Sequence, residues 1–303
     1  MIAGLAGVVP PIVTPLGADG DLDRPALGRI VDRMLDAGAH GVFVLGSCGE
    51  GATLSDAVRR QTIEAAVERA GGRGPVLVGA IDTATDRIIA QARIAAALGA
   101  DGIVATAPLY YRTFHHDEIR AHFARLSDAV ALPMLVYNIP SAAQPLLPET
   151  LVALAEVAHV VGVKDSSGDW QAFQRLLALR RERRARLALF QGAEDLAAVS
   201  VMMGADGLVP GIANLAPRLV VELYQAAAAA DVRAAGELQQ RVSALCAVYG
   251  ERSWLRALKG ACMMIGLCGA RTSLPIPEVE PEEVERIRPI LQAHDLIGEL
   301  TRL

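Results

Sequence analysis

Eight short apolar segments recur along the chain up to residue 209, and each is followed by a longer stretch with helical spacing. The segments are continuously apolar rather than alternating, as expected for parallel strands that are covered on both faces. The stretches between them place apolar residues on one helix face, as Leu27, Ile30, Val31 and Met34 do. This alternation predicts an α/β fold with a parallel sheet. The predicted strands are residues 8–14, 41–45, 75–80, 102–106, 134–138, 160–164, 187–191 and 207–209.

A four-residue pattern, Gly-Ala-X-Gly, separates a helix from the next strand at residues 38–41, 99–102 and 204–207. The first glycine suits the left-handed position that ends a helix. The repeats are irregularly spaced, which excludes a solenoid. Eight strand–helix units in roughly 220 residues predict a TIM (β/α)8 barrel, which we assign to residues 1–224. A doubly wound sheet is the alternative, but no GxGxxG follows the first predicted strand.

The chain beyond Pro217 contains no further strand pattern and is predicted to be helical. We assign residues 225–303 to a C-terminal helical region that follows the barrel. Apolar spacing predicts four helices, the first of which begins within the last residues assigned to the barrel. They cover residues 219–230, 233–248, 254–265 and 282–300.

Composition narrows the class of protein. With 29 basic and 34 acidic residues the net charge is −5, which argues against nucleic acid or a membrane surface as the main partner. The four cysteines form no CxxC pair and the six histidines show no metal-ligand spacing, so we expect no metal site and a reducing, cytoplasmic setting. The N-terminus lacks a basic leader, and no apolar run approaches the roughly 20 residues that span a bilayer.

One lysine has an unusual position. The chain has only two lysines, Lys164 and Lys259, and every other basic residue is arginine. Lys164 ends the apolar segment 160–163. An amine that loses its proton can attack a carbonyl carbon, which a guanidinium cannot do. Alternatively, Lys164 extends from the strand end into solvent or pairs with Asp165. The strand position alone leaves both interpretations open.

Polar residues gather where the predicted strands end, and these are the places where TIM barrels carry their catalytic groups. A lysine with hydroxyl groups and glycine-flanked amides is what a Schiff-base site requires. Each residue also has a structural interpretation: Tyr137 as a buried aromatic, Ser47 as a helix cap and Tyr110 as interface packing. The polar segments at the ends of the second, fourth, fifth, sixth and seventh predicted strands are residues 46–50, 108–111, 137–138, 164–168 and 192–195.

Four motifs in order resemble the dihydrodipicolinate synthase / N-acetylneuraminate lyase family of pyruvate-dependent class I aldolases. They are GSCGE (46–50), YNIP (137–140), VKDSSGD (163–169) and GADG (204–207). The resemblance covers nearly the whole chain. It implies a TIM barrel with a C-terminal helical region, assembly as a dimer or homotetramer, and chemistry without a metal or cofactor.

The resemblance also implies a role for each matching residue. Lys164 would form the imine with pyruvate, and Tyr137 would move protons at that imine. Ser47 would link Tyr137 to a second tyrosine contributed by a neighbouring subunit. Tyr110 matches that second tyrosine, with Tyr111 as the alternative. Cys48 and Gly49 match the segment that binds the substrate carboxylate, and Val209 would make a backbone contact from the eighth strand.

Three departures from the family pattern bear on the substrate. Cys48 stands where the family usually has Thr, Ser or Asn, and a thiol is a weak hydrogen-bond donor. Ala142 occupies the position of an arginine by which synthase members hold their second substrate, which argues against the synthase reaction. The sugar-acid lyases of the family hold substrate hydroxyls at positions that correspond here to Ser166, Glu194 and Asp195.

These observations predict a cytoplasmic lyase that cleaves or forms a carbon–carbon bond to pyruvate in a 2-oxo-4-hydroxy acid or a 2-keto-3-deoxy sugar acid. The alternatives within the family are 4-hydroxy-tetrahydrodipicolinate synthase and a 2-keto-3-deoxy sugar-acid dehydratase that uses the same imine. A protein that binds pyruvate-like acids without catalysis is the alternative from another class, and the set Lys164, Tyr137 and Ser47 argues against it.

Overall fold

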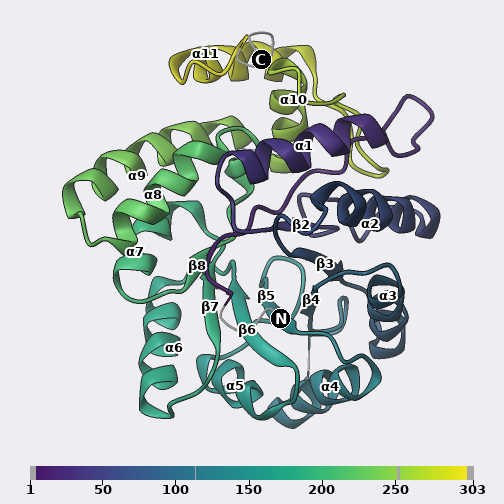
Figure 1. Ribbon diagram of the computed structural model, residues 1–303, viewed down its shortest axis with the longest axis vertical. Helices are drawn as coiled ribbons and strands as arrows, with labels where there is room; N and C mark the ends of the chain where they lie inside the picture. Colours follow the sequence, from purple (N-terminus) through teal and green to yellow (C-terminus); the bar gives the residue numbers. More distant parts are fainter. Residues whose placement is uncertain (1–4, 113, 251–252, 299–303) are drawn as a thin grey trace.

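The computed structural model of the chain describes residues 5–112, 114–250 and 253–298. Eight parallel strands form one sheet, and the predicted barrel is confirmed. The strands lie at the centre of the molecule with helices around them (Figure 1). The strands are β1 (Gly7–Val8), β2 (Val42–Val44), β3 (Val76–Ala80), β4 (Gly102–Thr106), β5 (Met134–Asn138), β6 (Val160–Asp165), β7 (Ala188–Gln191) and β8 (Gly207–Leu208).

The sheet runs in the order β1-β8-β7-β6-β5-β4-β3-β2 and closes between its two edges at Pro11 and Phe43. Phe43 donates its N–H to the Pro10 carbonyl and accepts from the Ile12 N–H, both at 2.9 Å. The predicted first strand, 8–14, was too long, because Pro10 and Pro11 have no N–H to donate to a ladder. β1 is therefore confined to two residues.

Helices alternate with the strands as predicted. Within the described residues the structure has eleven α-helices and four short 3-10 segments. The helices are α1 (Arg24–Asp36), α2 (Asp56–Ala70), α3 (Thr85–Ala97), α4 (His116–Ala129), α5 (Pro148–Ala153), α6 (Trp170–Glu182), α7 (Ala197–Met202), α8 (Pro217–Ala228), α9 (Val232–Cys246), α10 (Trp254–Met264) and α11 (Pro281–Ala293).

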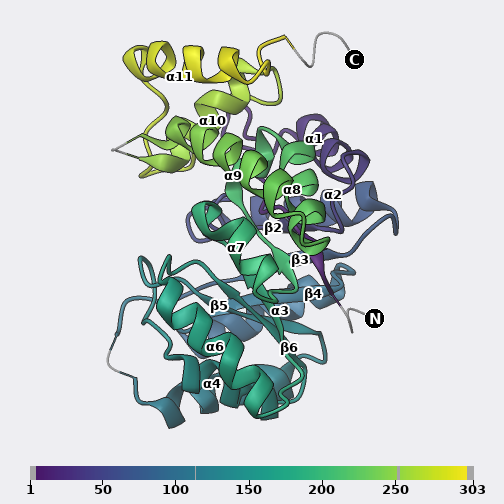
Figure 2. The ribbon, with the colours of Figure 1, turned by 90° about the vertical axis from the view of Figure 1, so that its left-hand side faces the viewer.

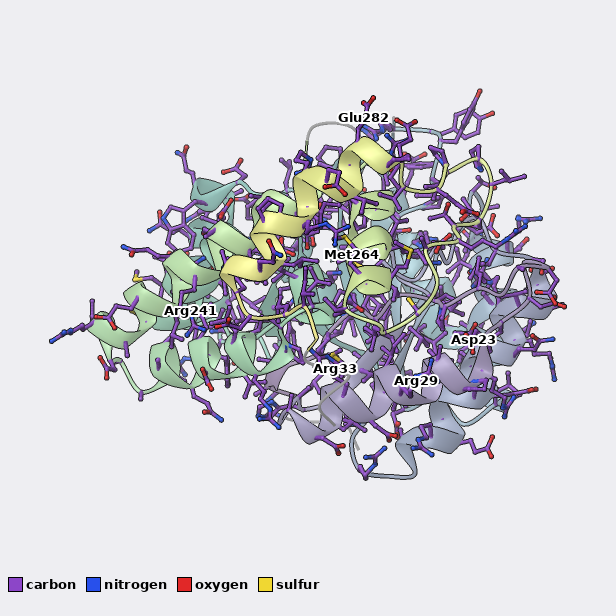
Figure 3. All side chains as sticks on the ribbon, turned by 90° about the horizontal axis from the view of Figure 1, so that it is seen from above. Asp23, Arg29, Arg33, Arg241, Met264 and Glu282 are labelled. Atoms are coloured by element: carbon purple, nitrogen blue, oxygen red, sulfur yellow. The ribbon has the colours of Figure 1, made fainter. Side chains whose placement is uncertain are left out.

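The C-terminal helices α9, α10 and α11 gather at one end of the molecule (Figure 2). Viewed from that end, α11 crosses in front of α10, with α9 on one side and α1 on the other (Figure 3). The division predicted between residues 224 and 225 falls inside α8. The last predicted helix, 282–300, was too long, since α11 ends at Ala293; residues 299 and 300 lie outside the described part of the chain.

The Gly-Ala-X-Gly pattern has a structural explanation. Its first glycines, Gly38, Gly99 and Gly204, have φ of 90°, 83° and 105°, as the left-handed helix end requires. The variable residue accepts a hydrogen bond from the first residues of a neighbouring strand. Asp206 Oδ2 accepts from Leu189 N at 2.7 Å, and Asp101 and His40 do the same for Val76 and Val8. The motif therefore ends a helix and aligns two strands at once.

Two apolar clusters form the core. One fills the barrel interior and includes Phe43, Leu77, Val104, Leu135 and Tyr137. The other packs the outer faces of the strands against the helices. Because side chains alternate along a strand, each of the strands β2 to β7 contributes to both clusters. Tyr137 thus lies inside the barrel near its carboxyl end.

Helix caps can be expected from the sequence where a Ser or Thr precedes a stretch with helical spacing, as Ser55 and Thr83 do. Ser55 does cap α2, since its hydroxyl accepts from Val58 N at 3.3 Å. Thr83 does not cap α3. The helix begins at Thr85, and the hydroxyl and N–H of Thr83 both donate to Asp82 instead. Among the described residues, no helix is both long and apolar enough to cross a membrane.

Candidate active site

Lys164 and Tyr137 are direct partners in the register of β6 and β5. Lys164 is 3% exposed, and its Nζ lies 4.1 Å from the centre of the Tyr137 ring and 5.0 Å from that of Phe43. Ring faces attract an ammonium group, but they do not neutralise it as a carboxylate does. None of the ion pairs between described residues involves Lys164. The lysine therefore neither extends into solvent nor pairs with Asp165.

Asp165 is occupied by other donors. Its Oδ2 accepts from Asn138 Nδ2 at 2.6 Å, and its Oδ1 accepts from the hydroxyl and the N–H of Ser167 at 2.7 and 3.1 Å. Only 4% of the residue is exposed, so these bonds stabilise a buried carboxylate. They also leave the neighbouring lysine without an anionic partner.

The loop 46–50 brings Ser47 to Tyr137. Ser47 Oγ lies 3.4 Å from the Tyr137 hydroxyl, as expected for two linked proton carriers. Gly49 is buried, and its N–H donates to no acceptor among the described residues. Buried N–H groups without a partner are rare in folded proteins, and this one can serve an anionic ligand. The loop therefore brings the Ser47 hydroxyl to Tyr137, and it contains a backbone N–H without a partner among the described residues.

Cys48 lies in the same loop and is 5% exposed. Burial raises the pKa of its thiol to about 12, while the positive charge of Lys164 opposes this rise and Glu194 adds to it. The thiol is therefore neutral at physiological pH. A neutral thiol is a weak donor, so the stronger hydrogen bonds to a carboxylate must come from the backbone and Ser47.

A cavity of about 340 Å³ joins these residues. Its floor includes Lys164, Tyr137, Ser47 and Cys48 from the barrel. Glu194, Tyr249 and Trp254 also line it. Lys164 and Glu194 are the only charged residues that line the cavity in the part of the chain described. The remaining predicted residues on its surface are Ser166 and Val209.

Glu194 is held by two donors on one oxygen. Its Oε1 accepts from the Tyr249 hydroxyl at 2.9 Å and from the Ile212 N–H at 3.2 Å. Burial, and then the charge of Glu194, raise the pKa of Tyr249 well above its usual value, so the phenol keeps its proton. Oε2 of Glu194 has no partner among the described residues and is available to a ligand.

Four predicted residues, counting the alternative Tyr111, do not line this cavity. Gly49 is one of them, although it directly follows the lining residue Cys48. Asp195 Oδ1 accepts from Ser243 Oγ of α9 at 2.7 Å and so joins the barrel to the C-terminal region. Tyr110 and Tyr111 lie in the loop after β4, where they are 80% and 64% exposed. Their rings meet edge to face at 5.0 Å. Within one chain, neither tyrosine reaches Ser47.

Tyr249 and Trp254 were not identified from the sequence. Tyr249 closes a 3-10 turn after α9, Trp254 begins α10, and their rings lie edge to face at 6.1 Å. Only 4% of the chain is aromatic, so two aromatic residues five positions apart were a usable signal. Helical spacing gave no reason to direct them toward the barrel end.

A larger hollow, of about 860 Å³, lies on the outer surface between α1 and α2. Three of its four arginines are engaged with acids: Arg24 with Glu68, and Arg69 and Arg73 with Asp32. It lies on the outer face of the helices and contains no lysine or tyrosine. The smaller cavity at Lys164 is therefore the candidate active site. No cluster of metal-ligating side chains exists within residues 5–112, 114–250 and 253–298.

The sequence profile of the Dihydrodipicolinate synthetase family matches residues 4–294. The chain belongs to this family. A 4-hydroxy-tetrahydrodipicolinate synthase of Methanopyrus kandleri is 33% identical over 97% of this chain and 98% of its own. The probable 2-dehydro-3-deoxy-D-pentonate aldolase YjhH of Escherichia coli is 30% identical over 96% and 98%. Relatives in this family thus carry the names of two different reactions.

Solved structures of the family agree. The dihydrodipicolinate synthase of Bacteroides thetaiotaomicron superposes with a TM-score of 0.91 at 34% identity, over 97% of this chain and all of its own. A monomeric dihydrodipicolinate synthase variant superposes with a TM-score of 0.92 at 26% identity, over 98% of this chain and 99% of its own. The structure of YagE of Escherichia coli in complex with pyruvate superposes with a TM-score of 0.91 at 26% identity, over 96% of this chain and 99% of its own. As a member of the Dihydrodipicolinate synthetase family, the chain is a lyase of the aldolase type that acts on pyruvate.

Proposed function

We propose that this lyase cleaves or forms the C3–C4 bond of a 2-keto-3-deoxy sugar acid or related 2-oxo-4-hydroxy acid through an imine on Lys164. One observation carries the proposal. Lys164 is buried at the end of β6, lines the cavity, contacts the ring of Tyr137 and has no carboxylate partner among the described residues. A buried amine in that position suits attack on a ketone.

The reaction follows from these groups. Lys164 in its unprotonated form attacks C2 of the substrate, loss of water gives an imine, and the imine nitrogen takes up a proton. Tyr137, or the substrate's own carboxylate, takes the proton of the C4 hydroxyl. The C3–C4 electron pair then moves toward the imine nitrogen, which releases an aldehyde and leaves an enamine. Protonation at C3 and hydrolysis of the imine release pyruvate and restore Lys164.

The carboxylate end of the substrate would be held by the loop 46–50. Ser47 and Cys48 line the cavity there. The hydroxyl of Ser47 and the N–H of Gly49, which has no acceptor among the described residues, would be the donors. The N–H of Val209 already donates to Gln191 O at 2.8 Å, so only its carbonyl remains as a backbone contact. Donors fixed before substrate arrives cost little reorganisation during the reaction.

The tail of the substrate would face Glu194 and Ser166. Glu194 offers an unshared carboxylate oxygen, which accepts from hydroxyl groups and repels a second carboxylate. No arginine lines the cavity in the described part of the chain, and Ala142 is an exposed residue that cannot replace one. These features support a neutral, hydroxylated tail and argue against the synthase reaction.

The enzyme would act as a homo-oligomer, a dimer or a tetramer. Tyr110 and Tyr111 form an exposed aromatic pair, which is typical of an interface rather than of a solvated surface. Tyr110 has a φ of 81°, an uncommon conformation for a residue other than glycine. Such conformations cluster at functional sites, which supports a role for Tyr110 in the partner's proton relay.

The cellular setting would be the cytoplasm. All four cysteines are free thiols, three of them buried. Free thiols persist most readily in a reducing compartment.

Borohydride trapping tests the imine. Incubation with pyruvate and borohydride should add one reduced pyruvyl group, located by peptide mass spectrometry on Lys164. Lys259 is an internal control, because its Nζ is fully buried in an ion pair. Lys164→Arg should abolish the adduct while the protein stays folded by circular dichroism. An adduct on Lys259, or none at all, would overturn the proposal.

A substrate screen separates the candidate reactions. Pyruvate release should be fastest from 2-keto-3-deoxy sugar acids, and turnover with pyruvate plus aspartate semialdehyde should be weak. Loss of water without pyruvate release would indicate a dehydratase. Robust consumption of aspartate semialdehyde would make the synthase the better assignment, and adduct formation without any turnover would indicate a binding protein.

A further inference from the structure

The second lysine forms the most deeply buried ion pair in the described part of the chain. Lys259 of α10 lies with its Nζ 2.7 Å from Glu50 Oε1, and both side chains are 0% exposed. The two residues are separated by 209 positions in the sequence. Taking both charges out of water is costly, and apolar side chains of similar size often stabilise such a site equally well. Net stability therefore does not by itself account for this pair.

The pair belongs to a closed ring of contacts around the loop 46–50. Lys259 Nζ also donates to the Thr14 carbonyl at 2.7 Å. Thr14 Oγ1 donates in turn to the Gly49 carbonyl at 2.7 Å, and Gly49 directly precedes Glu50. The other oxygen of Glu50 accepts from the N–H and hydroxyl of Ser273. The ring thus fixes the end of the loop from three separate segments.

The loop itself is under backbone strain. Leu45, which directly precedes the loop, and Glu50, at its end, have φ of 58° and 57°. Residues other than glycine rarely adopt this left-handed conformation. A Cβ on Gly51 would lie 1.9 Å from the Leu45 carbonyl oxygen, so the loop is also tightly wound. Strained conformations persist only where surrounding contacts over-determine them. The ion pair and Thr14 are such contacts.

The strained loop carries Ser47 and Cys48, which line the cavity. Glu50 donates its N–H to the Ser47 carbonyl at 3.2 Å, which ties the loop end to the residue that meets Tyr137. The free N–H of Gly49 lies one residue from Glu50. A shift of Glu50 would therefore move both the hydroxyl and the amide relative to Lys164.

We infer that Lys259 is a positioning residue, which through Glu50 and Thr14 holds the loop 46–50 in the shape that binds the carboxylate of the 2-oxo acid. The inference rests on the proposed imine chemistry of Lys164. It gives the C-terminal region a part in substrate binding, because α10 supplies the lysine from outside the barrel.

Matched variants test the inference. Lys259→Met removes the charge and keeps an apolar stem. Arg256→Met is the control, since Arg256 lies on the same helix, is 5% exposed and pairs with Glu283 of α11 without touching the loop. The readout is the pyruvate concentration that gives half-maximal adduct on Lys164, measured where each variant is fully folded by circular dichroism.

Lys259→Met should raise this pyruvate concentration roughly tenfold, the scale expected when about one hydrogen bond to the carboxylate is misplaced. Arg256→Met should lower the melting temperature but keep the concentration within twofold of the unmodified enzyme. Equal concentrations for the two variants would overturn the inference and leave Lys259 a purely structural residue.

Thr14 provides a second test that leaves no charge unpaired, in case Lys259→Met does not fold. Thr14→Val removes the bond to Gly49 and should raise the pyruvate concentration in the same direction, whereas Thr14→Ser should restore it. No difference between these two variants would also overturn the inference. If the unmodified enzyme forms no adduct on Lys164, the proposed function fails instead, so the two failures are distinguishable.

Discussion

Asn138 Nδ2 donates to Asp165 Oδ2 at 2.6 Å, one residue beyond the point where Tyr137 meets Lys164. Asn138 also accepts from the Leu146 N–H at 3.0 Å through its Oδ1. Both side chains are buried, so the bond fixes the carboxyl ends of β5 and β6 relative to each other. The positions of the phenol and the amine depend on this contact.

Asn138→Ala should therefore affect both stability and chemistry. The substitution removes a donor from a buried carboxylate, which typically costs about 1–3 kcal/mol in the free energy of unfolding. Urea denaturation measures that loss, and the rate of borohydride-trapped adduct on Lys164 should fall with it. Unchanged stability and trapping rate would show that the Ser167 donors hold Asp165 by themselves.

Acid stability should depend on His122. The ring accepts from the Thr85 hydroxyl at 2.9 Å and donates to the Thr106 carbonyl at 3.1 Å, so it is buried in its neutral form. Burial lowers the pKa of His122 from 6.5 to about 4, and the bond to Thr106 opposes the shift. Between pH 6.5 and about 4, the unfolded chain therefore binds a proton at His122 that the folded chain does not bind.

The free energy of unfolding therefore decreases as the pH falls from 6.5 toward 4, by about 3 kcal/mol in all, and the titration of His122 no longer changes it above pH 6.5. His122→Gln should reduce the pH dependence of the free energy of unfolding by that order, as measured by urea titrations at pH 7.5, 6, 5 and 4.5. His159→Asn, at an exposed position, is the control and should leave the slope unchanged. Equal slopes for the two variants would contradict the assignment.

Glu194 should set the preference for the substrate tail. Glu194→Gln keeps an acceptor for Tyr249 but removes the negative charge. Cleavage of a 2-keto-3-deoxy sugar acid should slow roughly tenfold, the value of about one charge-assisted hydrogen bond. Cleavage of a 4-hydroxy-2-oxo diacid should improve relative to it, because the repulsion is gone. Steady-state kcat/KM for the two substrates gives the ratio, and an unchanged ratio would exclude Glu194 from the tail site.

Tyr110 should act across a subunit interface. Tyr110→Phe should leave the pyruvate adduct detectable but slow turnover by roughly 10²-fold, the scale of losing one acid–base group. Hybrids of Tyr110→Phe and Lys164→Arg subunits decide the direction. If Tyr110 acts on the neighbour, one site of a hybrid dimer carries both defects and the other carries none, so activity returns.

The controls are each parent variant alone and a matched hybrid of Tyr111→Phe with Lys164→Arg, which tests the alternative tyrosine. Sedimentation should establish that hybrids have formed. A fully active monomer, or hybrids without recovered activity for either tyrosine, would refute a shared relay.

The sequence by itself determined the barrel and the position of Lys164 at the end of a strand. Apolar segments of strand length, helical spacing between them and the glycines before β2, β4 and β8 are local signals, because burial and left-handed turns are set by nearby residues. The same kind of signal placed Lys164 at a strand end. It overestimated β1, since the two prolines act through missing ladder bonds rather than through hydropathy.

Only the tertiary structure decided which side chains meet. Asp165 bonds to Asn138, which leaves Lys164 unpaired, and this choice depends on the register of β5 and β6. Tyr249 reaches Glu194 across 55 positions, and Lys259 reaches Glu50 across 209. Such contacts depend on how the barrel closes and how α10 packs over its end. No local sequence pattern determines contacts between residues so far apart in the sequence. The contact of Tyr249 with Glu194 and the buried ion pair therefore form only when the whole chain is folded.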